Sequence, residues 1–368
     1  MGRTIRTRTR LPFLTQVGVV AMVVSSGVVV MPEHWLNFAG NPALAQETPT
    51  RKPDTPIYPP TLPAKPSQPG ERKPTEDYRV SALQADRTGT LWVGSWQGLA
   101  EINATTGQIL TRVNLPNPTI GALAMDRSHR LWVGTYEGLA RVDPRSNEVT
   151  TQNFSLPSNH ILSLLVDRRG YLWVGSDRGL TLISPDQGLI MTTFENLPGV
   201  SADVLTLDAL GNLWVGTLEG LVQINTASAL VMRKITNVPG ITVQALAVDR
   251  RGSLWVGTPN NLLEVNPKTG TVVRSVTQMK GRNVTAIRFD AGDRLWVGTS
   301  NGLFLLNHYN GAIVSQVTDL PSSRILSLSP DTGGKFWVGT DEGLAWVNTR
   351  TGRARSHLTF KRPAGQVY

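Results

Sequence analysis

Short apolar runs alternate with polar turns along most of this chain, and the runs recur as a unit. In the unit around Trp173, apolar runs over 161–166, 171–176, 180–184 and 189–194 are separated by turns rich in glycine, aspartate and proline. Such short runs between turn-forming residues predict β-strands, and nothing in the unit has the spacing of an amphipathic helix. Each unit is therefore expected to be a four-stranded antiparallel meander.

The second strand of the unit carries the sequence Leu-Trp-Val-Gly, which returns along the chain at a nearly constant spacing. The first step is 40 residues and each later step is 41, which places the tryptophans at Trp92, Trp132, Trp173, Trp214, Trp255, Trp296 and Trp337. Repetition at this period is typical of an array of supersecondary units. Seven such units predict an all-β fold, a seven-bladed β-propeller over residues 78–368.

Both faces of the Leu-Trp-Val strand are apolar, because successive side chains point to opposite sides. Neighbouring units must therefore cover both faces, and packing between units should hold the body together. A buried tryptophan removes about 200 Å² from water, which is worth about 5 kcal/mol of transfer free energy. The units run from an inner strand at Val80 to an outer strand predicted over 353–360, so ring closure needs no exchange of strands.

An aspartate precedes each of these tryptophans by six residues. These residues are Asp86, Asp126, Asp167, Asp208, Asp249, Asp290 and Asp331. A carboxylate at the end of a strand accepts backbone N–H bonds in the following turn, and a catalytic group is needed once rather than seven times. We interpret the aspartates as structural, and we assign no metal site to them.

The pattern Leu-Trp-Val-Gly-Thr-x-x-Gly-Leu resembles the repeat of the two-component regulator propeller family, which forms the extracytoplasmic sensor part of some hybrid histidine kinases. Asn261 departs from it where glycine belongs, and His129 fills a turn position that is glycine in most units. Val142-Asp143-Pro144 and Leu156-Pro157 resemble streptogramin lyase repeats more loosely. The first resemblance implies a ligand-binding sensor-like propeller, and the second implies a lyase- or hydrolase-like enzyme.

The chain begins with the three parts of a secretory signal. A basic segment at 1–10 leads into an apolar run at 17–31, and Ala43-Leu44-Ala45 forms a cleavage site. We expect a signal peptide over residues 1–45, a proline-rich linker over 46–77 and a periplasmic or otherwise extracytoplasmic location. The alternative is an uncleaved anchor, in which case the N-terminal segment would contact a membrane.

Composition narrows the function classes. A hydrophobic content of 40% suffices for a large core, and the lack of cysteine rules out disulfides, thiolate metal sites and cysteine nucleophiles. The net charge of +9 includes a contribution from four arginines in the first ten residues. No basic stripe interleaved with aromatic residues is present, so we expect no nucleic-acid partner.

An enzymatic alternative depends on His160, which begins an inner strand. The lyase resemblance would require a histidine and a carboxylate acting together on an ester across the central opening, with Mg²⁺. No convincing second histidine accompanies His160, and the sequence has neither a Gly-x-Ser-x-Gly elbow nor a phosphate-binding loop. We therefore assign no catalytic residue and no cofactor.

Polar and aromatic loop residues converge on one end of the predicted ring. They come from the loops before the inner strands and from the turns between second and third strands. The ligand-binding candidates are Trp96, Tyr136, Asn159, His160, Arg178, Glu219, Arg282, Arg324 and Glu342. Aromatic faces with amide and carboxylate neighbours suit a sugar or a peptide.

The leading hypothesis is an exported, non-enzymatic propeller that binds such a ligand or another extracytoplasmic protein at this end. Because no transmembrane or kinase segment follows Tyr368 in this sequence, any signal is expected to pass through a partner. A third hypothesis is a scaffold that binds proteins through its blade edges.

Overall fold

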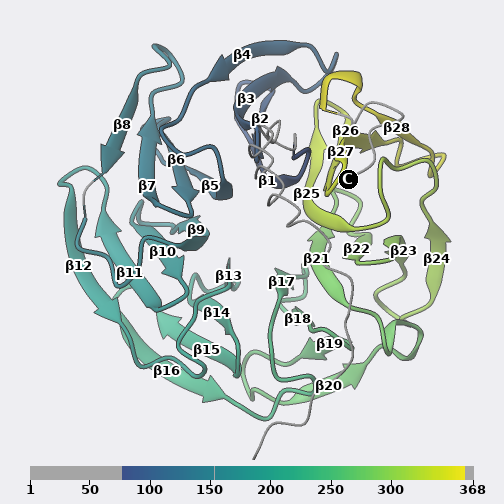
Figure 1. The fold of residues 1–368 in the computed structure, drawn as a ribbon. Coiled ribbons are helices and arrows are strands. Elements are labelled where there is room, and N and C mark those ends of the chain that lie inside the picture. The colour runs from purple at the N-terminus through teal and green to yellow at the C-terminus, as the bar shows by residue number, and fades with distance from the viewer. Residues whose placement is uncertain (1–76, 153, 361–368) are drawn as a thin grey trace, which may run out of the picture. The chain divides into compact units, whose positions relative to one another are not determined.

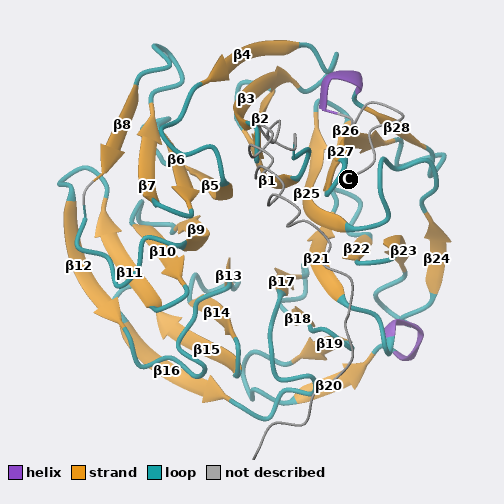
Figure 2. Cartoon of the chain, in the orientation of Figure 1, coloured by secondary structure: helices purple, strands orange, loops and turns teal. Residues whose placement is uncertain are grey.

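The computed structural model describes residues 77–152 and 154–360. The predicted signal peptide and the predicted linker up to residue 76 lie outside the described residues. Strands make up most of the ordered elements, as Figure 2 shows, and the described part contains two short 3₁₀ helices and no α-helix. No helix within these two ranges has the length and apolar character needed to cross a membrane.

The strands form seven antiparallel sheets around a central opening (Figure 1). Blade 1 contains β1 (Val80–Ala85), β2 (Thr90–Ser95), β3 (Gly98–Asn103) and β4 (Ile109–Val113). Blade 2 contains β5 (Ile120–Met125), β6 (Leu131–Thr135), β7 (Gly138–Val142) and β8 (Val149–Gln152). Blade 3 contains β9 (Ile161–Val166), β10 (Leu172–Ser176), β11 (Gly179–Ser184) and β12 (Leu189–Phe194). Blade 4 contains β13 (Val204–Leu207), β14 (Leu213–Thr217), β15 (Gly220–Asn225) and β16 (Leu230–Ile235). Blade 5 contains β17 (Ala245–Val248), β18 (Leu254–Gly257), β19 (Leu262–Val265) and β20 (Val272–Ser275). Blade 6 contains β21 (Val284–Phe289), β22 (Leu295–Thr299), β23 (Gly302–Leu306) and β24 (Ile313–Gln316). Blade 7 contains β25 (Ile325–Thr332), β26 (Lys335–Thr340), β27 (Gly343–Val347) and β28 (Ala354–Ser356). The 3₁₀ helices η1 (Thr277–Met279) and η2 (Leu358–Phe360) lie outside the sheets.

The predicted seven-bladed propeller is confirmed. Each blade pairs four strands in chain order, so the ring closes without exchanging strands between blades 1 and 7. The strands of blade 3 match the predicted ranges to within one residue. The outer strand predicted over 353–360 is wrong in length, because β28 ends at Ser356 and a 3₁₀ turn follows. Phe360 in that turn joins a buried cluster with Val80 and Leu91 of blade 1.

The core lies between blades, as the two apolar faces of the second strand require. All seven repeat tryptophans have no exposed surface. Trp92 packs with Leu131 and Val133 of the next blade. Trp337 of blade 7 packs in the same way with residues of blade 1, which closes the ring.

The glycine of each Leu-Trp-Val-Gly segment makes room for the next blade. A Cβ at Gly298 would lie 2.5 Å from Cγ2 of Ile325, which begins the inner strand of blade 7. At Gly339 a Cβ would lie 2.3 Å from the Val80 carbonyl oxygen, across the closure. Because real Cβ atoms do not approach so closely, the repeated glycine follows from the spacing between blades.

The repeated aspartate joins the first turn of the blade to the buried indole. In blade 4, Asp208 Oδ1 accepts the N–H groups of Leu210 and Asn212, both at 2.9 Å. Its Oδ2 accepts the indole N–H of Trp214 at 3.3 Å. The same indole bond joins the aspartates and tryptophans of blades 2, 3, 5 and 6. The arrangement supports the structural interpretation of these aspartates.

Blades 1 and 7 differ from this scheme. Asp86 contacts Nδ1 of His129 at 3.3 Å, and the buried Trp92 Nε1 has no hydrogen-bond partner. In blade 7 the indole of Trp337 donates to the Thr332 carbonyl instead. Asp331 has a φ of 50° and its carboxylate accepts the backbone N–H of Ala291 in blade 6. The prediction that this aspartate caps its own turn is therefore wrong.

Candidate functional site

Two sets of loops meet at one end of the ring, which we call the aromatic face. It comprises the residues leading into the inner strands and the turns between second and third strands. Backbone bonds join the two sets: Trp96 N donates to Arg79 O at 3.1 Å, and Tyr136 N donates to Thr119 O at 3.2 Å. The sequence prediction that these loops share a face is thus confirmed for both blades.

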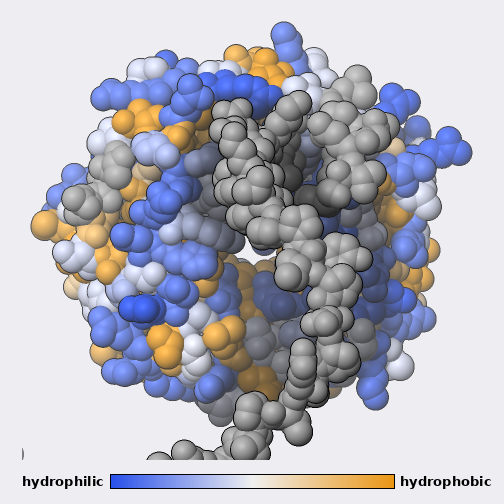
Figure 3. All heavy atoms as spheres, in the orientation of Figure 1, coloured by the Kyte–Doolittle hydropathy of each residue, from blue (hydrophilic) through white to orange (hydrophobic). Residues whose placement is uncertain are grey.

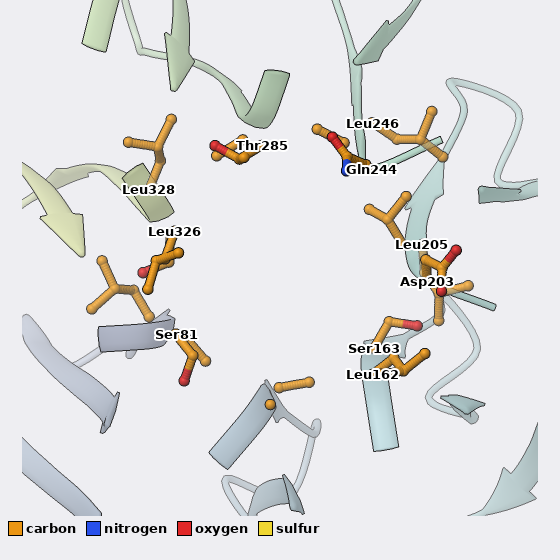
Figure 4. A pocket seen from close by; sticks show the side chains of 18 of the residues that line it. Ser81, Leu162, Ser163, Asp203, Leu205, Gln244, Leu246, Thr285, Leu326 and Leu328 are labelled. Atoms are coloured by element: carbon orange, nitrogen blue, oxygen red, sulfur yellow. The ribbon is translucent and has the colours of Figure 1, made fainter. Parts of the chain in front are cut away.

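The seven inner strands surround a central cavity of about 270 Å³. Side chains from all seven blades line it, and Figure 4 shows Ser81, Asp203, Gln244 and Thr285 among leucines around the open centre. Figure 3 shows hydrophilic residues to the left of the opening and hydrophobic residues below it. Asp203 and Arg288 are the ionisable residues of this lining.

Enclosure shifts the pKa of both ionisable groups. Burial raises the pKa of the half-buried Asp203 carboxyl, and the hydrogen bond from Ser201 Oγ at 3.0 Å opposes that rise. The Arg288 side chain is accessible to the opening, while its enclosure by the ring lowers the guanidinium pKa. Arginine side chains in proteins are protonated at neutral pH. The lining therefore carries a positive group on blade 6.

Three aromatic rings form a row across blades 1, 2 and 3. The ring centroids of Trp96 and Tyr136 lie 5.9 Å apart, and those of Tyr136 and His160 lie 4.1 Å apart, both in edge-to-face geometry. Arg79 places its guanidinium carbon 4.1 Å above the Trp96 ring. Edge-to-face pairs of this kind are attractive, so the rings order one another. We call Trp96, Tyr136 and His160 the aromatic row.

Gly121 lies beside Tyr136 at the edge of the channel, where the Ile161 carbonyl of the next blade leaves no room for a side chain. A Cβ there would lie 3.5 Å from Cε1 of Tyr136 and 2.5 Å from the Ile161 carbonyl oxygen. Tyr136 remains 42% exposed, whereas Trp96 and His160 are half buried. The row therefore combines fixed positions with ring surface that a ligand can reach.

His160 has a carboxylate neighbour that is too distant for a direct hydrogen bond. Its Nδ1 lies 3.6 Å from Asp177 Oδ2, and its Nε2 is buried without a partner. Hydrogen bonds in proteins rarely extend to this length. The geometry does not favour the acid–base pair that the enzymatic alternative needs. Within the described ranges, no three His, Cys, Asp or Glu side chains are grouped closely enough to hold a metal ion.

Several buried polar atoms on the aromatic face have no hydrogen-bond partner. They are His160 Nε2, Gln244 Oε1, Asn283 Oδ1 and Asp341 Oδ1. Three of the four are oxygen acceptors, from blades 5, 6 and 7. Because an unpaired buried polar group costs free energy, native structures seldom keep one without a reason. These oxygens call for a hydrogen-bond donor.

The other candidate residues surround the row without joining it. Asn159, Arg178, Glu219 and Arg324 are exposed, and Glu342 is half buried. Arg282 stacks over Phe304 at 4.6 Å and donates from Nε to the Gln278 carbonyl, so it serves its own blade. No ring contact or ion pair links Arg178, Glu219, Arg282 or Arg324 to the aromatic row in the described part of the chain.

Sequence reasoning missed Arg79. Arg79 lies thirteen residues before Trp92, the repeat tryptophan of blade 1. His160 in blade 3 and Asn283 in blade 6 occupy the same position in their repeats. The repeat alone contained this signal, because the position leads directly into each inner strand.

Comparison with known families confirms the repeat. Residues 114–137, 155–178 and 237–260 match the two-component regulator propeller family. Each matched segment runs from the loop before an inner strand to the turn after the second strand, which are the elements that build the aromatic face. No curated protein sequence matches the chain significantly.

Solved propellers have similar backbones. The extracellular domain of a putative hybrid two-component system from B. thetaiotaomicron has a TM-score of 0.63 at 19% identity; the match covers 74% of this chain and 40% of that one. Virginiamycin B lyase from Staphylococcus aureus has a TM-score of 0.62 at 17% identity over 73% of this chain and 93% of that one. A streptogramin B lyase has a TM-score of 0.62 at 14% identity, over 72% and 91%. At these identities the similarity establishes the shared fold.

Proposed function

We propose that this protein is an exported, non-enzymatic propeller that binds a glycan on its aromatic face. The observation that carries the proposal is the aromatic row, which places Trp96, Tyr136 and His160 in contact across three blades beside the channel. Sugar rings present C–H faces that pack on aromatic side chains, and their hydroxyls provide hydrogen-bond donors. Both features match what this face offers.

The unpaired oxygens favour a donor-rich ligand. Gln244 Oε1, Asn283 Oδ1 and Asp341 Oδ1 are buried acceptors without donors. Binding a hydroxyl-rich molecule would relieve the free-energy cost of leaving them unpaired. A peptide offers fewer donors for the same surface, so we rank it second.

Extracytoplasmic placement and a sensor-like role belong to the same proposal. They are supported by the predicted signal at 1–45 and by the fold shared with an extracellular domain of a hybrid two-component system. Export is tested by fusing residues 1–45 to a reporter enzyme that is active only outside the cytoplasm. A reporter that stays inactive contradicts the export part of the proposal.

A glycan and peptide panel tests the binding part. A ligand at about 100 times its dissociation constant stabilises the folded protein by about 2.7 kcal/mol, which a thermal-shift assay detects. Removal of an aromatic anchor from a binding site costs about 2 kcal/mol, so Trp96→Ala and Tyr136→Ala should each weaken binding about thirtyfold. Tyr309→Ala is the matched control, because Tyr309 is 64% exposed and lies outside the aromatic face.

The outcomes separate the hypotheses. Glycan binding that is lost in Trp96→Ala and kept in Tyr309→Ala supports the proposal. Binding of peptides alone changes the ligand class. Capture of a protein partner that is unaffected by both aromatic variants favours the scaffold hypothesis, for which β16 offers Leu230 and Met232, exposed by 66% and 54%.

A further inference from the structure

The opposite end of the ring carries a cluster of arginines in blades 1, 2 and 3. Arg87, Arg127 and Arg168 each follow the repeat aspartate of their blade and are exposed in the turn between first and second strands. Together with His129 they line a cavity of about 360 Å³ at the ends of the inner strands. We call this site the arginine pocket.

Two carboxylates, Asp126 and Asp167, also line the arginine pocket, and both are paired with other groups. Asp126 pairs with Arg130 at 2.7 Å, and Asp167 pairs with Arg169 at 2.9 Å. Both also accept an indole N–H, as described above. Over residues 77–152 and 154–360, no carboxylate forms an ion pair with Arg87, Arg127 or Arg168. Their charges are therefore available to a ligand.

Contacts with the next blade orient two of these arginines. The guanidinium of Arg168 donates to the carbonyl oxygens of Ala209 at 3.0 Å and Asp208 at 3.3 Å. Arg127 lies over Gly170, where a Cβ would be 3.2 Å from its Cδ. A fixed guanidinium loses less side-chain entropy when it binds an anion, which favours binding.

His129 makes blade 2 different at this position. It has a φ of 63° in a turn position that holds glycine in most blades, and its ring contacts Asp86. Asp86 Oδ1 therefore contacts the imidazole and also accepts the backbone N–H of Arg87. Arg87 is left with its side chain in the lining of the pocket.

The remaining blades do not continue the cluster. The equivalent residues are Ala209, Arg250, Ala291 and Thr332. Arg250 lies 4.0 Å from Asp293 and donates to the Ala291 carbonyl, and it does not line the pocket. Arg288 of blade 6, which lines the channel, occupies the same position in the repeat as Gln84 of blade 1. Gln84 lines the arginine pocket. The arginines that line the pocket thus come from blades 1 to 3, and Arg288 of blade 6 lines the neighbouring channel.

We propose that the arginine pocket binds a small molecule that carries at least two phosphate, sulfate or carboxylate groups. Guanidinium groups form paired hydrogen bonds with such oxyanions, and three of them around one cavity match a multivalent anion better than a single charge. A volume of about 360 Å³ is that of a small-molecule site rather than of a polymer groove. The site is separate from the aromatic face and does not depend on glycan binding.

Isothermal titration calorimetry of the purified protein at low salt tests the site. The probes are pyrophosphate, citrate and a disulfated disaccharide, which distinguish the three kinds of anionic group. We expect at least one probe to bind, with an affinity that falls as salt rises. Arg127→Gln and Arg87→Gln should each weaken binding about tenfold, because each removes a charge-assisted hydrogen-bonding group.

Two controls make the test specific. Arg250→Gln removes the equivalent arginine of blade 5 and should leave affinity unchanged, whereas Arg127→Lys should restore part of the loss. Trp96→Ala should also leave anion binding unchanged, which separates this site from the aromatic face. The proposal is overturned if no probe binds, or if Arg127→Gln and Arg250→Gln alter the affinity equally.

Discussion

Replacement of Asp208 by alanine should destabilise the propeller more than a typical substitution. The Asp208 carboxylate accepts five N–H groups, from Leu210 N, Asn212 N, Asn212 Nδ2, Trp214 Nε1 and Gln223 Nε2. Asn212, Trp214 and Gln223 are buried, so four of these donors would lose their partner away from water. Leu210 is 82% exposed, and solvent can replace its bond.

The magnitude follows from those four donors. Each buried hydrogen bond contributes about 1 kcal/mol, so Asp208→Ala should lower the free energy of unfolding by about 4 kcal/mol. For a domain of this size that corresponds to a fall in Tm of about 10 °C. Thermal and guanidinium unfolding followed by tryptophan fluorescence measure the change.

Asp86→Ala is the matched control in blade 1. Asp86 has the same place in the repeat, but it accepts no hydrogen bond from the indole N–H of Trp92. The substitution removes the contacts to Arg87 N and His129 only, so we expect a loss of about 1 kcal/mol. If Asp208→Ala destabilises the protein no more than Asp86→Ala does, the aspartate–indole bond is not what holds the blade, and our explanation of the repeat fails.

Two further predictions concern the ring and the channel. Gly298→Ala should destabilise the protein by about 2 kcal/mol, because its Cβ would lie 2.5 Å from Ile325 Cγ2. In an Ile325→Ala background, which is itself destabilised by loss of a buried side chain, the same glycine substitution should lower the Tm by less, and an equal loss in both backgrounds would contradict the packing argument. Asp203→Asn should raise the Tm at neutral pH. Burial raises the Asp203 pKa, so its ionised form opposes folding as pH rises above the ordinary aspartate range, and the gain should vanish at low pH, where the carboxyl is protonated in both states. A gain that persists unchanged at acidic pH would show that the titration of Asp203 is not its cause.

The two ends of the ring have different chemistry although they are built from the same repeat. On the aromatic face, substitutions in the loops of blades 1 to 3 introduce Trp96, Tyr136 and His160. At the opposite end, substitutions in the turns of the same blades introduce the arginine pocket. Both sites depend on positions where the repeat does not constrain the residue, which is where a propeller can acquire function without loss of its core.

The sequence by itself determined the architecture, because each blade repeats the same local demands. The tryptophan must be covered on both faces, its indole N–H needs an acceptor, and the glycine must leave space for the next strand. These demands recur at a fixed period, so the seven blades follow from counting, as do the strands of blade 3 to within one residue, whereas the outer strand of blade 7 is shorter than predicted. Arg79 could also have been found in this way, from its distance to Trp92.

Only the tertiary structure decided which functional side chains meet. Trp96, Tyr136 and His160 belong to three blades, and their contacts depend on how far each blade is rotated about the axis. The predicted Arg282 lies in the correct loop set, yet Phe304 of its own blade holds it in a cation–π contact. The arginine pocket was not predicted, because whether a given arginine pairs with its neighbouring aspartate or faces the cavity depends on local geometry that the repeat does not specify. Periodicity fixes positions along the chain, whereas side-chain contacts between blades depend on distances across the ring.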